Sequence, residues 1–183
     1  MTWITDEHRG AVFGGEREKR KISKSSPLTM IQPHRYTLWR RFKEGADISN
    51  MAAFIGLNPS TATPEKLDPT VSKCEYWAQH WGFEGFVMLN LFSYRATDPT
   101  AMLKHEDPTG DPENLAAIVS VSKQAGLVVA CWGNDGQHMD RGTAIKAALG
   151  GVELRCLKLN MTGEPKHPLY HKKAVALDDL VTV

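Results

Sequence analysis

Short, predominantly apolar segments alternate with segments of helical periodicity from residue 51 to residue 159. The apolar segments span residues 51–57, 86–92, 127–132 and 152–159. The helical segments, in which apolar side chains recur every three or four positions, span residues 70–81, 113–124 and 143–149. Strands that are apolar throughout are typical of parallel sheets buried on both faces. The alternation therefore predicts an α/β fold, with three αβα layers around a central four-stranded, mainly parallel sheet.

The first 50 residues differ from this pattern. Residues 36–42 are rich in aromatic and branched side chains and predict a strand, which we expect to pair with residues 11–13 as a β-hairpin. Residues 17–24, between them, carry five Lys and Arg side chains. Such a run is typical of a solvated loop, and a phosphate-contacting arm is the functional alternative. We therefore predict an N-terminal β extension with a basic loop over 1–50 and one compact α/β domain over 51–183.

Composition and charge exclude several classes of protein. The 183 residues are 42% hydrophobic, and 22 Lys and Arg side chains balance 21 Asp and Glu side chains to a formal charge of +1. This balance predicts a folded chain that is neither disordered nor a polycation. The three cysteines form no CxxC pair, which argues against a disulfide framework or a zinc knuckle. No apolar segment is long enough to span a membrane, and the charged start MTWITDEHRG lacks a signal-peptide pattern, so we expect a cytoplasmic protein with no membrane partner.

Polar side chains gather where the predicted strands end. The strand-end segments are GLNPSTA, NLFSYRATDP, CWGN and GEPKHPLY. Ligands of parallel α/β sheets bind beyond the carboxyl ends of the strands, so these segments are the candidate site. The sequence contains no GxxxxGKS/T, no GxGxxG after a strand and no GxSxG, which argues against a nucleoside triphosphate, a dinucleotide cofactor and a serine nucleophile. His167 and His171 have no third metal ligand nearby in the sequence, so we expect neither a metal nor a cofactor.

The ordered motifs GLNPSTA, LDPT, NLFSYRATDP, CWG and GEPKHPLY resemble those of the domain-of-unknown-function family numbered 1643. This resemblance covers residues 36–171. The order of the motifs in turn resembles the uracil-DNA glycosylase superfamily, in which a GxNPG-like turn follows the first strand, an asparagine ends the second and an HPS-like turn follows the fourth. It implies a glycosylase-like fold and a hydrolase that cleaves the N-glycosidic bond of a flipped, modified or mismatched DNA base.

The superfamily resemblance also implies a role for each polar strand end. Asn58 would hold the attacking water, and His167 would donate a hydrogen bond to the departing base, which makes these two the candidate catalytic residues. Asn90 would read the Watson–Crick edge of the base, because an amide offers both a donor and an acceptor. The remaining expected site residues are Leu57 and Pro59 at the base, and Ser60, Arg95, Lys166, Leu169 and Tyr170 at the nucleic acid. The implied partner is DNA, Leu169 or Tyr170 would act as a wedge in the base stack, and no obligate protein partner is evident.

Each role has a structural alternative. Asn58 and Pro59 form a common turn pair whose amide bonds the neighbouring backbone, and Asn90 can be paired inside the core. His167 followed by proline is compatible with a helix entry, and Asp68 followed by proline predicts a helix cap. Arg95 and Asp98 can form a structural ion pair as readily as a phosphate clamp.

Two rival functions also stay open: a non-catalytic nucleic-acid or nucleotide-binding protein with the same pocket, and a hydrolase of free nucleosides. The salt dependence of DNA binding separates them, because each phosphate contact steepens it.

Overall fold

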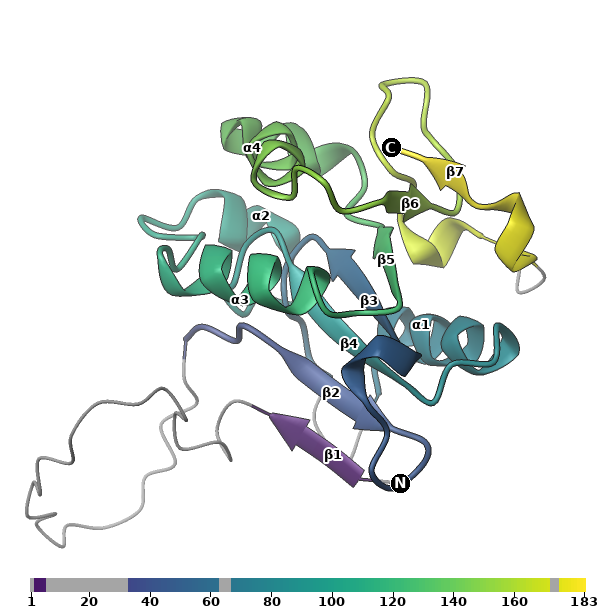
Figure 1. Ribbon diagram of the computed structural model, residues 1–183. Helices are drawn as coiled ribbons and strands as arrows, with labels where there is room; N and C mark the ends of the chain where they lie inside the picture. Colours follow the sequence, from purple (N-terminus) through teal and green to yellow (C-terminus); the bar gives the residue numbers. More distant parts are fainter. Residues whose placement is uncertain (1, 6–32, 63–66, 172–174) are drawn as a thin grey trace, which may run out of the picture.

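A computed structural model describes residues 2–5, 33–62, 67–171 and 175–183 (Figure 1). In these residues seven strands form one sheet in the order β1-β2-β4-β3-β5-β6-β7. The strands are β1 (Thr2–Thr5), β2 (Leu38–Arg41), β3 (Met51–Gly56), β4 (Gly85–Asn90), β5 (Leu127–Ala130), β6 (Leu154–Cys156) and β7 (Val181–Thr182). The α-helices are α1 (Pro69–His80), α2 (Pro99–Leu103), α3 (Glu113–Ser122) and α4 (Arg141–Ala148).

The middle of the sheet is parallel. Strands β4, β3, β5 and β6 are neighbours in that order, and each adjacent pair runs in parallel. This confirms the predicted four-stranded parallel centre, although the fourth strand is shorter than the predicted 152–159 because only Leu154–Cys156 pairs with β5. Antiparallel strands extend the sheet at both edges, with β7 beside β6 and β2 beside β4.

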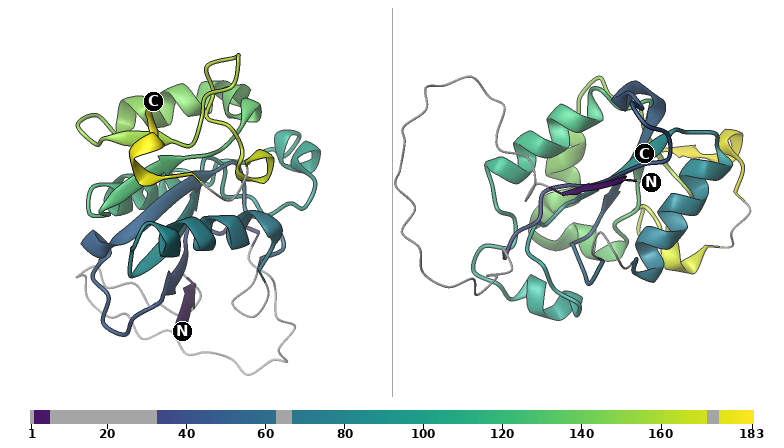
Figure 2. Two further views of the ribbon diagram at one scale, coloured as in Figure 1. Left: turned by 90° about the vertical axis from the view of Figure 1, so that its right-hand side faces the viewer. Right: turned by 90° about the horizontal axis from the view of Figure 1, so that it is seen from below.

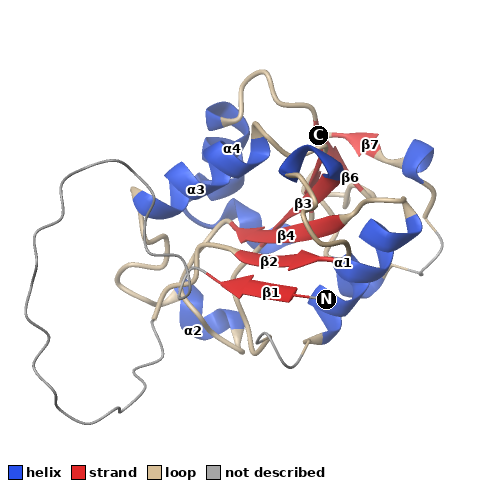
Figure 3. Ribbon diagram, turned by 60° about the horizontal axis from the view of Figure 1, so that its bottom comes forward, coloured by secondary structure: helices blue, strands red, loops and turns tan. Residues whose placement is uncertain are grey.

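The N-terminal strand belongs to this main sheet. The predicted strand at 36–42 is β2, which pairs with β4 on one side and with β1 on the other (Figure 3). Its outer partner is Thr2–Thr5, which corrects the prediction of a hairpin with residues 11–13. Those residues and the basic segment 17–24 lie outside the described residues.

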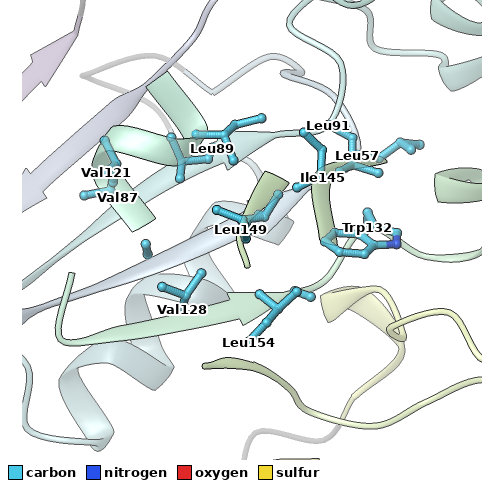
Figure 4. Packing of buried hydrophobic residues seen from close by; sticks show 14 of the residues in the cluster. Leu57, Val87, Leu89, Leu91, Val121, Val128, Trp132, Ile145, Leu149 and Leu154 are labelled. Atoms are coloured by element: carbon cyan, nitrogen blue, oxygen red, sulfur yellow. The ribbon is translucent and has the colours of Figure 1, made fainter. Parts of the chain in front are cut away.

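Helices cover both faces of the sheet, as the right-hand view of Figure 2 shows. On one face, Trp77 of α1 packs into a cluster with Phe54 and Phe86. On the other, Ile145 of α4 packs into a second cluster with Val87 and Leu89, part of which Figure 4 shows. Side chains along β3, β4 and β5 alternate between the two clusters, which explains why these strands are almost entirely apolar.

Proline and aspartate begin two of these helices. Asp68 precedes Pro69, and its Oδ1 accepts a hydrogen bond of 2.8 Å from the backbone N–H of Val71, which caps α1. Asp98 precedes Pro99 in the same way and accepts 2.9 Å from the N–H of Thr100, which caps α2. A carboxylate at this position satisfies a backbone donor that has no partner within the helix. The predicted cap at Asp68 is confirmed, and Asp98 has a capping role that the sequence interpretation did not assign.

Candidate functional site

A cleft of about 680 Å³ lies at the carboxyl ends of the parallel strands. Its lining includes Gly56 and Asn58 at the end of β3, Asn90 at the end of β4, Trp132 after β5 and His167 after β6. The chain crosses from β3 to β4 on one side and from β5 to β6 on the other, so the connections reverse direction between β3 and β5. Open parallel sheets bind ligands at such a switch point. The three polar strand-end residues Asn58, Asn90 and His167 therefore share one cavity.

Asn58 follows β3 and is half-buried in the cleft wall. Its Nδ2 donates hydrogen bonds of 3.1 Å to the carbonyl of Pro59 and 2.9 Å to the carbonyl of Ala96. These two bonds use both amide donors and fix the orientation of the side chain. The Oδ1 atom has no hydrogen-bond partner among the described residues. Because Asn58 lines the cleft, this oxygen is available there as a hydrogen-bond acceptor of fixed orientation.

Asn90 is the last residue of β4 and is only 5% exposed. Its backbone carbonyl accepts a hydrogen bond of 3.2 Å from Nδ2 of Asn114, which anchors the end of the strand. Its side-chain amide lines the cleft and has no hydrogen-bond partner among the described residues. A Cβ atom on Gly56 would lie 3.0 Å from Asn90 Oδ1, so the glycine leaves the space that this amide needs. A buried polar group without a protein partner is expected to bind water or a ligand.

His167 precedes a short 3-10 helix, η4 (Pro168–Tyr170). Its Nδ1 accepts a long hydrogen bond of 3.4 Å from the backbone N–H of Leu169. Gly133, in the turn after β5, has a φ of 79° and donates 2.9 Å to the carbonyl of Pro165. A Cβ at position 133 would lie 3.4 Å from the Cβ of His167, so this turn and the histidine pack closely. A left-handed φ favours glycine at this junction.

The imidazole of His167 is held in its neutral form. Burial lowers its pKa below the ordinary value of 6.5, and this effect is larger than the opposing attraction of Asp68. Lys73 lowers the pKa further, and Asp135 raises it. Because Nδ1 accepts a hydrogen bond, the proton of the neutral ring is assigned to Nε2. The histidine thus offers an N–H donor rather than a full charge.

The residues beside Asn58 divide into two groups. Leu57 and Ser60 line the cleft, as the sequence interpretation expects of site residues. Pro59 is buried and does not line it, and its carbonyl instead accepts from Asn58 and from the N–H of Ala96. Pro59 therefore supports the orientation of Asn58 rather than contacting the cavity.

The expected nucleic-acid contacts also divide. Leu169 and Tyr170 line the cleft and are 44% and 74% exposed, which makes them large apolar side chains at its rim. Lys166 and Arg95 do not line it. The backbone N–H of Lys166 donates 2.8 Å to the carbonyl of Lys158, and that of Arg95 donates 2.9 Å to the carbonyl of Pro33. The carboxylate of Asp98 accepts the hydrogen bond that caps α2.

Several lining residues were missed from the sequence. Arg35 is buried, lies before β2, and donates 2.6 Å from Nη1 to the carbonyl of Ala62. Asp68 was interpreted only as a cap, yet it also lines the cleft, as does Asp135. Trp132 was treated as the end of an apolar strand, and its Nε1 donates 2.6 Å to the buried carboxylate of Glu164. The LDPT motif was the one available signal for Asp68, while the position of Arg35 depends on long-range strand pairing.

In the part of the chain that the structure describes, no three His, Cys, Asp or Glu side chains come together to form a metal site. No helix formed by those residues is long and apolar enough to span a bilayer.

The arrangement presents hydrogen-bond donors and acceptors to a small polar molecule. Asn90 offers a donor and an acceptor, His167 offers an N–H donor, and Asn58 offers an acceptor, all lining one cavity. Hydrogen-bonding groups of both kinds on a largely buried surface discriminate strongly between heteroaromatic rings, because a mismatched ring leaves them unpaired.

Comparison with known proteins reveals one match. No curated protein and no solved structure is significantly similar to the chain. A profile of one protein family matches residues 35–169, which include β2 through β6 and every residue that lines the cleft except Tyr170. The match extends over well more than half of the sequence, and the chain therefore belongs to the family described as Protein of unknown function (DUF1643).

Proposed function

We propose that the protein hydrolyses the N-glycosidic bond of a flipped nucleobase, as a DNA glycosylase does. The observation that carries the proposal is the side-chain amide of Asn90, which is buried, lines the cleft and has no protein partner among the described residues. Leaving such an amide unpaired costs about 1–3 kcal/mol, so its position at the cleft favours a ligand-binding role. A base edge supplies the acceptor and donor that this amide lacks.

His167 supports the leaving-group half of the reaction. When the bond between the sugar C1′ and the base nitrogen breaks, its electron pair goes to the base, which departs as an anion. A hydrogen bond from Nε2–H of neutral His167 to an oxygen of the base stabilises that charge. A donor fixed in the cleft needs no reorganisation when the charge develops.

Asn58 supports the water half. Its amide hydrogens are tied to backbone carbonyls, so Oδ1 can accept a hydrogen bond from the water that attacks C1′. The water forms the new C–O bond, one of its protons is lost to solvent, and a solvent proton neutralises the base anion. An amide is a poor proton acceptor, so most of the rate comes from leaving-group stabilisation. The carboxylates of Asp68 and Asp135 add negative charge to the cavity where the sugar becomes positive.

The rim supports a polymeric substrate. A base reaches a recessed cleft only after it leaves the stack, and enzymes fill the gap with apolar side chains. Exposed Leu169 and Tyr170 lie two and three residues after His167 and are suited to this position. Lys166 and Arg95 remain proposals as phosphate contacts outside the cleft.

The direct test incubates the full chain with single- and double-stranded oligonucleotides that carry uracil, deaminated purines, alkylated bases or mismatches. Abasic sites are scored by alkaline cleavage. We expect base release from at least one substrate, and loss of it in Asn90→Leu and His167→Gln. Lys123→Met is the control and should keep full activity. Lys123 is the C-cap residue of α3 and does not line the cleft.

Other outcomes identify the rivals. Salt-dependent DNA binding without base release, surviving Asn58→Ala, supports a non-catalytic binding protein instead. Release of bases from free nucleosides but not from DNA supports a nucleoside hydrolase. Either result contradicts the proposed DNA glycosylase.

A further inference from the structure

Lys73 connects helix α1 to the turn that carries His167. Its Nζ donates hydrogen bonds to three backbone carbonyls: 3.1 Å to Pro168, 2.9 Å to Leu169 and 2.6 Å to His171. A lysine ammonium has three N–H donors and no acceptor, so the turn uses all of them. The residue is half-buried, and its partners lie about a hundred positions further along the chain.

This contact supplies donors to the carbonyls of Leu169 and His171, whereas the carbonyl of Pro168 also accepts 3.1 Å from the backbone N–H of His171 within the turn. The η4 helix is a single 3-10 turn, and the last carbonyls of a helix have no partners within it. A hydrogen-bonded ammonium on a rigid helix therefore fixes the position of η4 relative to the cleft.

We propose that Lys73 is a positioning residue that holds the 167–171 turn, and with it the imidazole of His167, against the cleft. The inference rests on the proposed function, because it assigns Lys73 a part in presenting the leaving-group donor. Lys73 itself does not line the cleft and touches no reacting atom.

The charge of Lys73 adds a second effect at the same histidine. Burial is the largest cause of the lowered pKa of His167, Asp68 and Asp135 oppose it, and Lys73 acts in the same direction as burial. Removal of the lysine charge should leave the two carboxylates less opposed and raise the pKa of His167. A lysine that only stabilised the fold would lower the melting temperature without this change.

The experiment compares Lys73→Met, Lys73→Arg and the control Lys123→Met in the full chain. Isotope-labelled histidine gives the pKa of His167 by NMR titration, and backbone amide shifts of Leu169 and Tyr170 report the position of the turn. Base release gives kcat and KM separately. We expect Lys73→Met to raise the pKa of His167, move the turn resonances and lower kcat by roughly 10- to 100-fold with a smaller change in KM.

Lys73→Arg separates geometry from charge. Arginine keeps the positive charge, but its planar fork cannot reproduce three bonds from one nitrogen. We therefore expect it to retain the wild-type pKa of His167 with only partial recovery of kcat, and it serves as the second variant if Lys73→Met does not fold.

An unchanged pKa of His167 together with unmoved turn resonances in Lys73→Met overturns the proposal. If the wild-type chain releases no base, the proposed function fails while the NMR data still decide the role of Lys73.

Discussion

Replacing Asn90 by leucine should stabilise the protein while removing ligand recognition. Leucine is close in shape to asparagine, and the amide it replaces is 5% exposed with no hydrogen-bond partner among the described residues. A buried amide without a partner costs about 1–3 kcal/mol. Cleft water offsets part of that cost, so we expect a gain of about 1 kcal/mol, or roughly 2–4 °C in melting temperature for a chain of this size.

Asn114→Leu is the matched control. Asn114 belongs to α3, is fully buried, and contacts the same end of β4 as the side chain of Asn90. Its Nδ2 donates 3.2 Å and 3.1 Å to the carbonyls of Asn90 and Leu91. Leucine removes the Asn114 donor from the carbonyl of Asn90, while the carbonyl of Leu91 keeps the 2.9 Å hydrogen bond from Nε of Arg141. The substitution also removes the Oδ1 atom of Asn114, which is buried without a partner. The net expectation is a loss of about 1–3 kcal/mol. The two substitutions are chemically identical and should therefore change stability in opposite directions.

Urea denaturation monitored by tryptophan fluorescence measures both variants against the wild type. Nucleobase binding is measured on the same samples by calorimetry, and Asn90→Leu should lose it. Destabilisation of Asn90→Leu to the same extent as Asn114→Leu would refute the reasoning, because the amide of Asn90 would then be part of the core.

Three further predictions follow from the site. Gly56→Ala places a Cβ 3.0 Å from Oδ1 of Asn90, so base binding should weaken roughly tenfold, about 1.4 kcal/mol, with little change in melting temperature; calorimetry checks this. His167 has a folded-state pKa below 6.5, so the unfolded chain takes up a proton at this residue before the folded chain does as the pH falls. The stability of the wild type should therefore decrease as the solution becomes more acidic. His167→Gln should show a smaller decrease, and melting temperatures at pH 5 and pH 8 measure both. Glu164→Leu removes the acceptor of the 2.6 Å hydrogen bond from Trp132, so the free energy of unfolding should fall by about 1–3 kcal/mol. The near-ultraviolet circular dichroism of the tryptophan should change as well. Glu164→Gln keeps an acceptor oxygen and should have a smaller effect on both measurements.

Hydrophobic patterning was enough to predict the centre of the fold. Strands β3 and β5 fall within the predicted apolar segments, β4 begins one residue before the predicted 86–92, and α1 begins and ends one residue from the predicted 70–81. These elements are buried on one face or on both, so the pattern of apolar side chains along each of them reflects which faces are buried. Continuous apolarity on both faces also indicated a parallel arrangement.

Long-range pairing and short elements were harder to predict. Strands β1 and β7 are edge strands whose partner strands lie far away in the sequence, and the local sequence pattern does not indicate which strand each will pair with. Helix α2 has five residues, too few to show helical periodicity. Its Asp-Pro start is nevertheless the same signal that begins α1, and it was readable at Asp98.

The rule for strand ends identified the polar residues that share the cleft but not all of its walls. Asn58, Asn90 and His167 are brought together because each follows a parallel strand. Arg35 enters from the segment before β2, and Lys73 acts on the turn from α1, so neither lies at a strand end. Pro59, Lys166 and Arg95 are close to the site in sequence, yet their side chains do not line the cleft. Proximity in sequence does not determine which way a side chain points.

The central claim is that Asn58, Asn90 and His167 surround a single flat ring. The most direct measurement is an NMR titration of labelled protein with free uracil, cytosine, adenine and guanine, following the two side-chain amides and the His167 imidazole. One base is expected to shift all three signals together along a single binding curve, and Asn90→Leu should abolish the effect. Signals that respond separately, or that stay unmoved by every base, would contradict the claim.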